Sequence, residues 1–137
     1  MPDAQVVYAP MESKSIGTPS GDFVVQENLA RAGRKGAARR GVPLHRHRME
    51  DEAWYVLEGI LHFQYGSREI KAPEGTGVLL PKGTPHTFWN PGPDPARYLL
   101  IMGPKTAGLL DVLHGPNRPP PAGLKALYDA FEIDLLE

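Results

Sequence analysis

Fifteen glycines and fifteen prolines are scattered through the 137 residues and separate short apolar runs from one another. Both residue types interrupt helices and favour turns. They follow no triplet repeat, so a collagen-like chain is excluded. Short apolar runs at this spacing are typical of many short strands joined by tight turns, and they predict a small all-β sandwich or barrel.

The apolar runs predict about eight strands between residues 22 and 103. A hairpin is expected at Glu58-Gly59, and another turn is expected at Gly66-Ser67. The predicted strands are Asp22–Ala30, Ala37–His47, Glu52–Gly59, Ile60–Gly66, Arg68–Pro73, Thr76–Gly83, His86–Asn90 and Ala96–Gly103.

Helix signals are confined to the C-terminal part of the chain. Lys105–Gly115 predicts a short helix that ends at its glycine. A second, amphipathic helix is indicated by apolar residues at helical spacing, and we expect it to pack on the barrel. These residues are Leu124, Leu127, Tyr128 and Phe131.

The length fits one domain, residues 1–137. We expect an N-terminal arm over residues 1–20, a β-barrel over 22–103 and a helical C-terminal extension over 104–137. The N-terminus lacks the pattern of a signal peptide, and no apolar run has the length of a membrane span, so we expect a cytoplasmic protein that does not bind a membrane.

Composition excludes several kinds of site. The formal net charge is −1 and the basic cluster Arg34–Arg40 is short, so we expect no nucleic-acid binding and interpret that cluster as a solvated strand face. The chain has no cysteine, which excludes disulfides, thiolate chemistry and cysteine-based metal sites.

The segment HRHRMEDE contains two histidines and three acids in eight residues. His45 and His47 are two positions apart, so on a strand both imidazoles point to the same side, about 7 Å apart at the backbone. Glu52 has the wrong parity for that face unless a turn intervenes, and the charged residues 48–51 suit a turn. Alone, this pattern is also typical of a surface strand with solvated charge.

A second segment, GTGVLLPKGTPHTFWN, contains a third histidine, His86. Gly83 can supply the positive φ of a tight turn, and Pro81 and Pro85 stiffen its two sides. The turn places His86 at the start of another strand. Alone, His86 also fits a half-buried histidine with no role in metal binding.

Together these segments resemble the two motifs of the cupin family, a small single-domain cupin in particular. The first motif is Gly-x5-His-x-His-x(3,4)-Glu-x6-Gly, and the second is Gly-x5-Pro-x-Gly-x2-His-x3-Asn. The first is matched by His45, His47, Glu52 and Gly59, and the second by Gly75, Pro81, Gly83, His86 and Asn90. Arg39 stands where the first motif begins with glycine, so we expect an altered bulge there and an intact ligand set.

The resemblance implies an all-β double-stranded β-helix, the cupin or jelly-roll barrel, with one or two short C-terminal helices. It also implies that His45, His47, Glu52 and His86 bind one divalent transition metal. Three neutral imidazoles and a carboxylate suit Fe, Mn, Ni, Cu or Zn, and the sequence does not distinguish them.

The C-terminal segment resembles that of quercetinase-like cupins. The segment contains no chemical motif, so it indicates the subfamily and not the activity. The first hypothesis for the site is an oxidoreductase, a metal-dependent dioxygenase that acts on a small enolic or phenolic compound. Glu52 is then the catalytic residue, and the quercetinase likeness implies that it accepts a substrate proton. Two alternatives use the same residues: a non-catalytic cupin that binds a small ligand, and a redox-neutral isomerase or lyase.

Apolar residues with inward parity are candidates for the wall of a pocket for a small-molecule ligand. These are Trp54, Val56, Phe63, Phe88, Tyr98 and Leu100, each of which also fits ordinary core packing. His62 is interpreted as a surface residue, His114 as a residue near a helix C-terminus, and Arg39 as a candidate anion anchor. Cupins usually dimerise, so we expect a homodimer that uses the N-terminal strand and the C-terminal helix.

Overall fold

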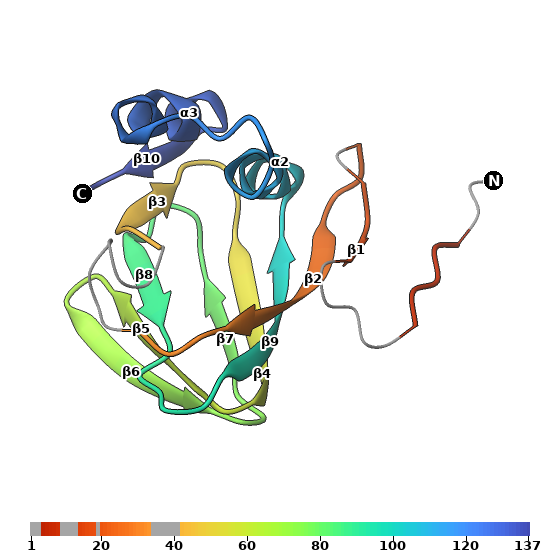
Figure 1. Cartoon of the computed structure of the whole chain (residues 1–137), viewed down its shortest axis with the longest axis vertical. Coiled ribbons are helices and arrows are strands. Elements are labelled where there is room, and N and C mark those ends of the chain that lie inside the picture. The colour runs from red at the N-terminus through yellow and green to blue at the C-terminus, as the bar shows by residue number, and fades with distance from the viewer. Residues whose placement is uncertain (1–3, 9–13, 19, 34–41) are drawn as a thin grey trace.

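The computed structural model describes residues 4–8, 14–18, 20–33 and 42–137. Ten strands within them form two five-stranded sheets that enclose a barrel (Figure 1). The first sheet has the order β1 (Ser15–Ile16), β2 (Val24–Ala30), β9 (Ala96–Met102), β4 (Glu52–Glu58) and β7 (Gly77–Leu80). The second has the order β10 (Ile133–Leu135), β3 (His45–His47), β8 (His86–Trp89), β5 (Ile60–Tyr65) and β6 (Arg68–Pro73). The predicted all-β, double-stranded β-helix fold is confirmed.

The predicted hairpin at Glu58-Gly59 is wrong. β4 pairs with β7 and β9, whereas β5 pairs with β6 and β8, so the chain passes from one sheet to the other at this point. Gly59 has φ +81°, and a Cβ added there would lie 3.0 Å from Ala96. A left-handed backbone in so little space favours glycine. The turn at Gly66-Ser67, in contrast, joins the paired strands β5 and β6 as predicted.

The barrel core lies between the two sheets. Buried residues alternate along β4 and β9, which is the period of strands with one face on a core. Trp54, Phe63 and Phe88 form an aromatic group in this core, with ring centroids 5.1 to 5.6 Å apart. The core therefore lies between the two sheets whose strands carry the predicted metal ligands.

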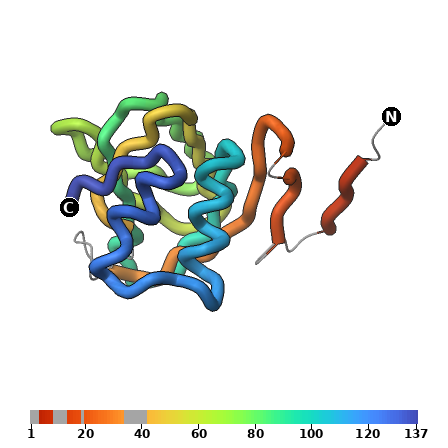
Figure 2. The backbone as a smooth tube through the Cα atoms, turned by 90° about the horizontal axis from the view of Figure 1, so that it is seen from above, coloured from red at the N-terminus to blue at the C-terminus, as the bar shows by residue number. Residues whose placement is uncertain are grey.

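The C-terminal segment covers one end of the barrel (Figures 1 and 2). It consists of α2 (Pro104–Leu113), a 3-10 turn η1 (Pro121–Gly123), α3 (Leu124–Ala130) and β10. Both predicted helices are present, but the predicted helical extension also contains a strand, because β10 pairs with β3 in the second sheet.

The apolar stripe of α3 packs on α2 and on β10, and β10 is a strand of the barrel's second sheet, so the helix packs on this end of the barrel as expected. Tyr128 joins Leu109, Leu113 and Ile133 in a small separate core. This core fixes α3 to α2 and β10, so the segment is held at the barrel end both by packing and by the pairing of β10 with β3.

Residues 4–8 belong to neither sheet, but Gln5 is tied to β1: its side-chain amide donates to the Ser15 carbonyl oxygen at 3.3 Å and accepts the Gly17 N–H at 2.7 Å. The cluster Arg34–Arg40, with Arg39, falls outside the described residues, so the structure neither supports nor contradicts its interpretation. The homodimer and the division into arm, barrel and extension stay predictions. No helix among the described residues is both long and apolar enough to cross a membrane.

Candidate metal centre

Three histidines of the candidate site lie on adjacent strands of the second sheet. His45 and His47 point to the barrel interior from β3, and both are buried. Arg46 between them points outward and forms an ion pair with Asp134 of β10. His86 opens β8 and lies opposite His45 in the β3–β8 pairing. The strand parity expected from the sequence therefore brings the three imidazoles to one side of the sheet.

The carboxylate comes from the facing sheet. Glu52 is the first residue of β4 and is buried, and residues 48–51 form the expected turn between β3 and β4. Gly83, with φ +88°, donates its N–H to the His47 carbonyl oxygen at 2.7 Å and so ties the turn before His86 to β3. The candidate site thus bridges the two sheets.

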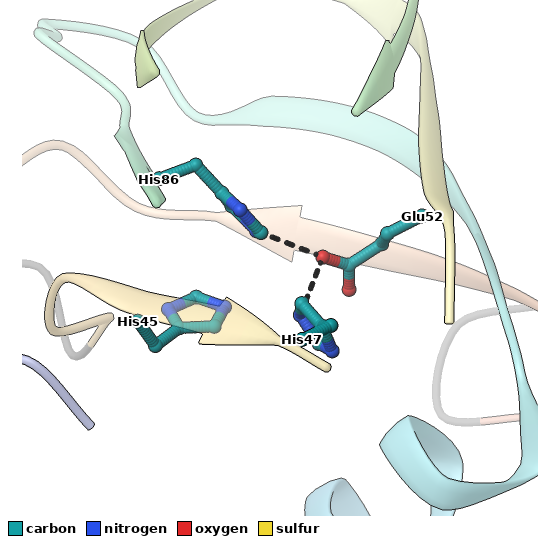
Figure 3. A group of neighbouring side chains, drawn as sticks. All are labelled: His45, His47, Glu52 and His86. Atoms are coloured by element: carbon teal, nitrogen blue, oxygen red, sulfur yellow. Dashed lines mark hydrogen bonds and ion pairs between the residues drawn. The ribbon is translucent and has the colours of Figure 1, made fainter. Parts of the chain in front are cut away.

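The four side chains converge on one point (Figure 3). Each offers one ligand atom, and these four atoms lie within 4.8 Å of one another. His47 Nε2 and His86 Nε2 both lie 3.1 Å from Oε1 of Glu52. Ligand atoms at about 2.1 Å from a shared cation are at most about 4.2 Å apart. The 4.8 Å limit of the cluster exceeds that value by about 0.6 Å.

Hydrogen bonds on the outer side of the imidazoles fix their tautomers. Nδ1 of His45 lies 2.7 Å from the Pro43 carbonyl oxygen, and Nδ1 of His86 lies 2.9 Å from that of Thr84. A carbonyl oxygen only accepts, so both Nδ1 atoms must donate. In the neutral rings the lone pairs then lie on Nε2, on the inner side of the site.

His47 is oriented by a pair of side chains that the sequence reasoning missed. The Thr106 hydroxyl donates to Glu50 Oε1 at 2.8 Å, so at 3.0 Å it accepts the Nδ1 proton of His47. Glu50 also accepts the backbone N–H groups of Lys105 and Thr106 in the first turn of α2. A Cβ at Gly103 would lie 2.2 Å from the Glu50 carboxyl carbon, so this contact requires glycine there.

Burial and neighbouring charges keep these groups in the form that binds a metal. Burial, followed by the effect of His86, lowers the pKa of His45 to about 3. Burial raises the pKa of Glu52, but its contacts with His47 and His86 outweigh that effect and hold the pKa well below its usual range. A neutral imidazole and an ionised carboxylate are the ligand forms that a divalent cation requires.

The residues therefore fit a bound cation. Nε2 of His47 and Nε2 of His86 each lie 3.1 Å from the same carboxylate oxygen, so either a proton or a metal cation must lie between them to offset the repulsion of their lone pairs. Nε2 of His47 is buried and has no hydrogen-bond partner among the described residues, although it lies near Glu52. A buried polar atom without a partner is costly unless something else satisfies it.

We expect Thr106→Val to lower metal affinity by about tenfold, because His47 loses the acceptor that fixes its tautomer. Thr106→Ser should restore the affinity, since it restores the hydroxyl. Thr87→Val is a matched control: this equally buried hydroxyl donates to the Val42 carbonyl oxygen and not to the hydroxyl–imidazole pair of Thr106 and His47. Titration against a competing chelator measures all three, and equal affinity in Thr106→Val and the unmodified protein would contradict the assignment.

A cavity of ≈ 720 Å³ lies between the site and the C-terminal segment. His45, His47 and Glu52 line it on one side, and residues of α2, α3 and β10 line it on the other. Of the predicted pocket residues, Phe88, Tyr98 and Leu100 line this cavity. Trp54, Val56 and Phe63 do not line it. All six residues belong to the barrel core, so for these three ordinary core packing is what the structure shows.

The remaining histidines lie outside the cluster. His62 on β5 is half-buried and its ring centroid lies 5.7 Å from that of Trp89. His114 ends α2, is exposed and lines the cavity. Asn90 of the second motif is structural: its side chain donates to the carbonyl oxygens of Ala30 and Asp94 and shapes the turn before β9.

Comparison with known proteins gives one family and several similar folds. Residues 37–102 match the family model described as Cupin domain. The chain is 30% identical over 92 residues to a protein named Oxidoreductase iacF from Pestalotiopsis fici; the match covers 63% of this chain and 45% of the relative, so this chain spans less than half of that protein's length.

Two solved structures have the same fold at low sequence identity. An uncharacterized protein with a double-stranded β-helix domain from Klebsiella pneumoniae has a TM-score of 0.54 and 21% identity, over 66% of this chain and 74% of that chain. A sugar phosphate isomerase from Silicibacter pomeroyi has a TM-score of 0.52 and 23% identity, over 65% of this chain and 57% of that chain. Likeness at this identity shows the fold alone.

Proposed function

Because this chain carries a cupin domain, we propose that it is a metal-dependent dioxygenase that acts on a small enolic or phenolic compound. The observation that supports this most is the placement of the His45, His47, Glu52 and His86 ligand atoms within 4.8 Å of one another beside a cavity of ≈ 720 Å³. A relative named as an oxidoreductase is consistent with the reaction class.

The four side chains would hold one divalent transition metal, with a net charge of +1 for the ion and its ligands. When bound, such an ion acts as a Lewis acid toward a substrate oxygen and supports oxygen chemistry. Its identity stays open among Fe, Mn, Ni, Cu and Zn, because imidazole and carboxylate ligands suit all five.

The chain's own residues bind the substrate and exclude water. Phe88 and Leu100 give the cavity an apolar wall next to the ligands. Tyr98 is buried beside Phe88, with ring centroids 5.6 Å apart, and burial, followed by the charge of Glu52, raises the pKa of its phenol. The phenol therefore stays protonated and can donate a hydrogen bond to a substrate oxygen.

Glu52 has two roles in this proposal, and its electrostatics favour one of them. Both imidazole contacts fall on Oε1, so Oε2 is the atom that would accept a substrate proton. The lowered pKa of Glu52 favours its role as a ligand and makes it a weak base while those contacts persist. Proton acceptance therefore requires the carboxylate to leave His47 and His86.

Two alternatives rest on the same cluster and cavity. In the first, the protein binds a small ligand without turnover; in the second, it is a redox-neutral isomerase or lyase. The solved isomerase has this fold, but at 23% identity that likeness does not favour its reaction here. The alternatives differ from the proposal in whether O₂ is consumed.

Oxygen uptake tests the proposed reaction. The protein is loaded separately with each of the five metals, mixed anaerobically with a chelating phenolic compound and then exposed to air. We expect a change in the absorption spectrum of the metal–phenolate complex before air is admitted and, with at least one of the redox-active metals, O₂ consumption afterwards, both absent in Glu52→Gln. A spectral change without O₂ uptake for any metal would exclude the dioxygenase and leave the two alternatives.

A further inference from the structure

Two arginines that line the cavity have no acidic partner among the described residues. Arg31 follows β2, and Arg118 lies between α2 and η1. Arg118 donates to the Leu113 carbonyl oxygen at 3.3 Å, and no ion pair involving Arg31 or Arg118 is present in the described ranges. Both side chains are exposed, which places them at the mouth of the cavity rather than beside the metal ligands.

The other arginines of the described chain are already engaged. Arg46, Arg48 and Arg97 form ion pairs with carboxylates, and Arg68 lies over the ring of Tyr65 at 5.8 Å. Among the described arginines, Arg31 and Arg118 are therefore the two for which neither an ion pair nor a stacked aromatic ring is found, and both line this cavity. Glu137, an acidic residue that also lines it, already takes part in another interaction.

The cavity thus has two polar ends and an apolar middle. Its inner end carries the ligand cluster, and its mouth carries Arg31 and Arg118. Apolar side chains between them come from the barrel and from α2: Phe88, Leu100, Leu109 and Leu113. Such a site favours a molecule with an oxygen at one end, a flat apolar body and an anion at the other end.

We propose that the cavity binds a small carboxylic acid whose carboxylate is held by Arg31 and Arg118 and whose enolic or phenolic oxygen faces the metal cluster. Only one part of this inference, the enolic or phenolic oxygen that faces the metal cluster, rests on the proposed function. Arginine suits a carboxylate because its planar guanidinium donates two parallel hydrogen bonds. The two arginines come from different parts of the chain, one after β2 and one in the C-terminal segment, so the segment takes part in substrate selection.

The experiment compares two ligands that differ in the acid group. Protein loaded with Zn(II), which is redox-silent, is titrated calorimetrically with 3,4-dihydroxybenzoate and with 4-methylcatechol. We expect the acid to bind about tenfold more tightly, because two partly exposed charge pairs contribute up to about that factor. The difference should shrink at high salt, which screens exposed charges.

Substitution identifies the residues responsible. In the double variant Arg31→Gln, Arg118→Gln the acid should lose its advantage, while the affinity for 4-methylcatechol stays the same. Arg68→Gln is the matched control: it removes an exposed arginine that does not line the cavity, and the advantage should persist.

Equal affinity for the two ligands in the unmodified protein would overturn the inference, as would an advantage that survives the double variant. The outcome is separable from the oxygen test. A preference for the acid without O₂ uptake would support this inference and exclude the dioxygenase. O₂ uptake without such a preference would support the dioxygenase and overturn this inference.

Discussion

Replacement of His86 with alanine is expected to remove most of the bound metal and to leave a folded protein. His86 is 1% exposed, and its Nε2 is one of the four atoms that converge within 4.8 Å. Loss of a residue that only orients a ligand costs about 10- to 100-fold in metal affinity, so loss of a ligand itself should cost more than about 100-fold. The backbone pairing of β8 with β3 and β5 does not depend on this side chain.

Elemental analysis of protein purified without an affinity tag measures the effect, and circular dichroism reports whether the fold is retained. His62→Ala is the control, because His62 lies on β5 outside the cluster and should not affect metal content. Full metal occupancy in a folded His86→Ala protein would show that the four side chains are not the metal site, and the proposed reaction would lose its basis.

The candidate site was predictable because its determinants are local in the sequence. The spacing of His45 and His47 fixes their common side of a strand, and a turn at residues 48–51 corrects the parity of Glu52. Gly83 has the positive φ that the turn before His86 requires. Each of these depends on a few neighbouring residues. That the two segments meet in one site, with Glu52 on the facing sheet, was implied by their resemblance to the cupin motifs.

Features that depend on distant parts of the chain were missed. β10 is three residues long and becomes a strand through its pairing with β3, almost ninety residues earlier, and a run of that length carries little periodicity. The change of sheet at Gly59 has the same cause, because a glycine between two strands is equally typical of a hairpin. Neither partner can be read from the local sequence.

The residues that support the site were missed for a related reason. Glu50 stands in a charged run that is typical of a solvated turn, and Thr106 stands in a helix 59 positions after His47. Only the packing of α2 on the barrel end joins them to the imidazole. The sequence therefore predicted the ligands themselves, whereas the groups that orient His47 and form the cavity mouth required the structure.

Phe63→Ala is expected to lower the free energy of unfolding by about 3–5 kcal/mol, the range for removal of a large aromatic side chain from a core. Phe63 is 0% exposed, and its ring stacks on Phe88 at 5.6 Å and meets Trp54 edge-on at 5.1 Å. Trp54 in turn contacts the His86 ring at 5.6 Å. The variant thus removes one ring of the aromatic group that contacts the candidate site through Trp54 and His86.

Chemical denaturation of protein stripped of metal measures this change separately from any stabilisation by bound metal. Ile60→Ala is the matched control on the same strand: Ile60 is 45% exposed, and its truncation should cost less than about 1 kcal/mol. If Phe63→Ala lowered the free energy of unfolding by less than about 1 kcal/mol, the stability of the barrel would not depend on this aromatic group. If the prediction holds, the folded variant should still bind metal, because all four ligands remain. Its metal affinity should be lower than that of the unmodified protein, because Trp54, which contacts His86, has lost its contact with Phe63.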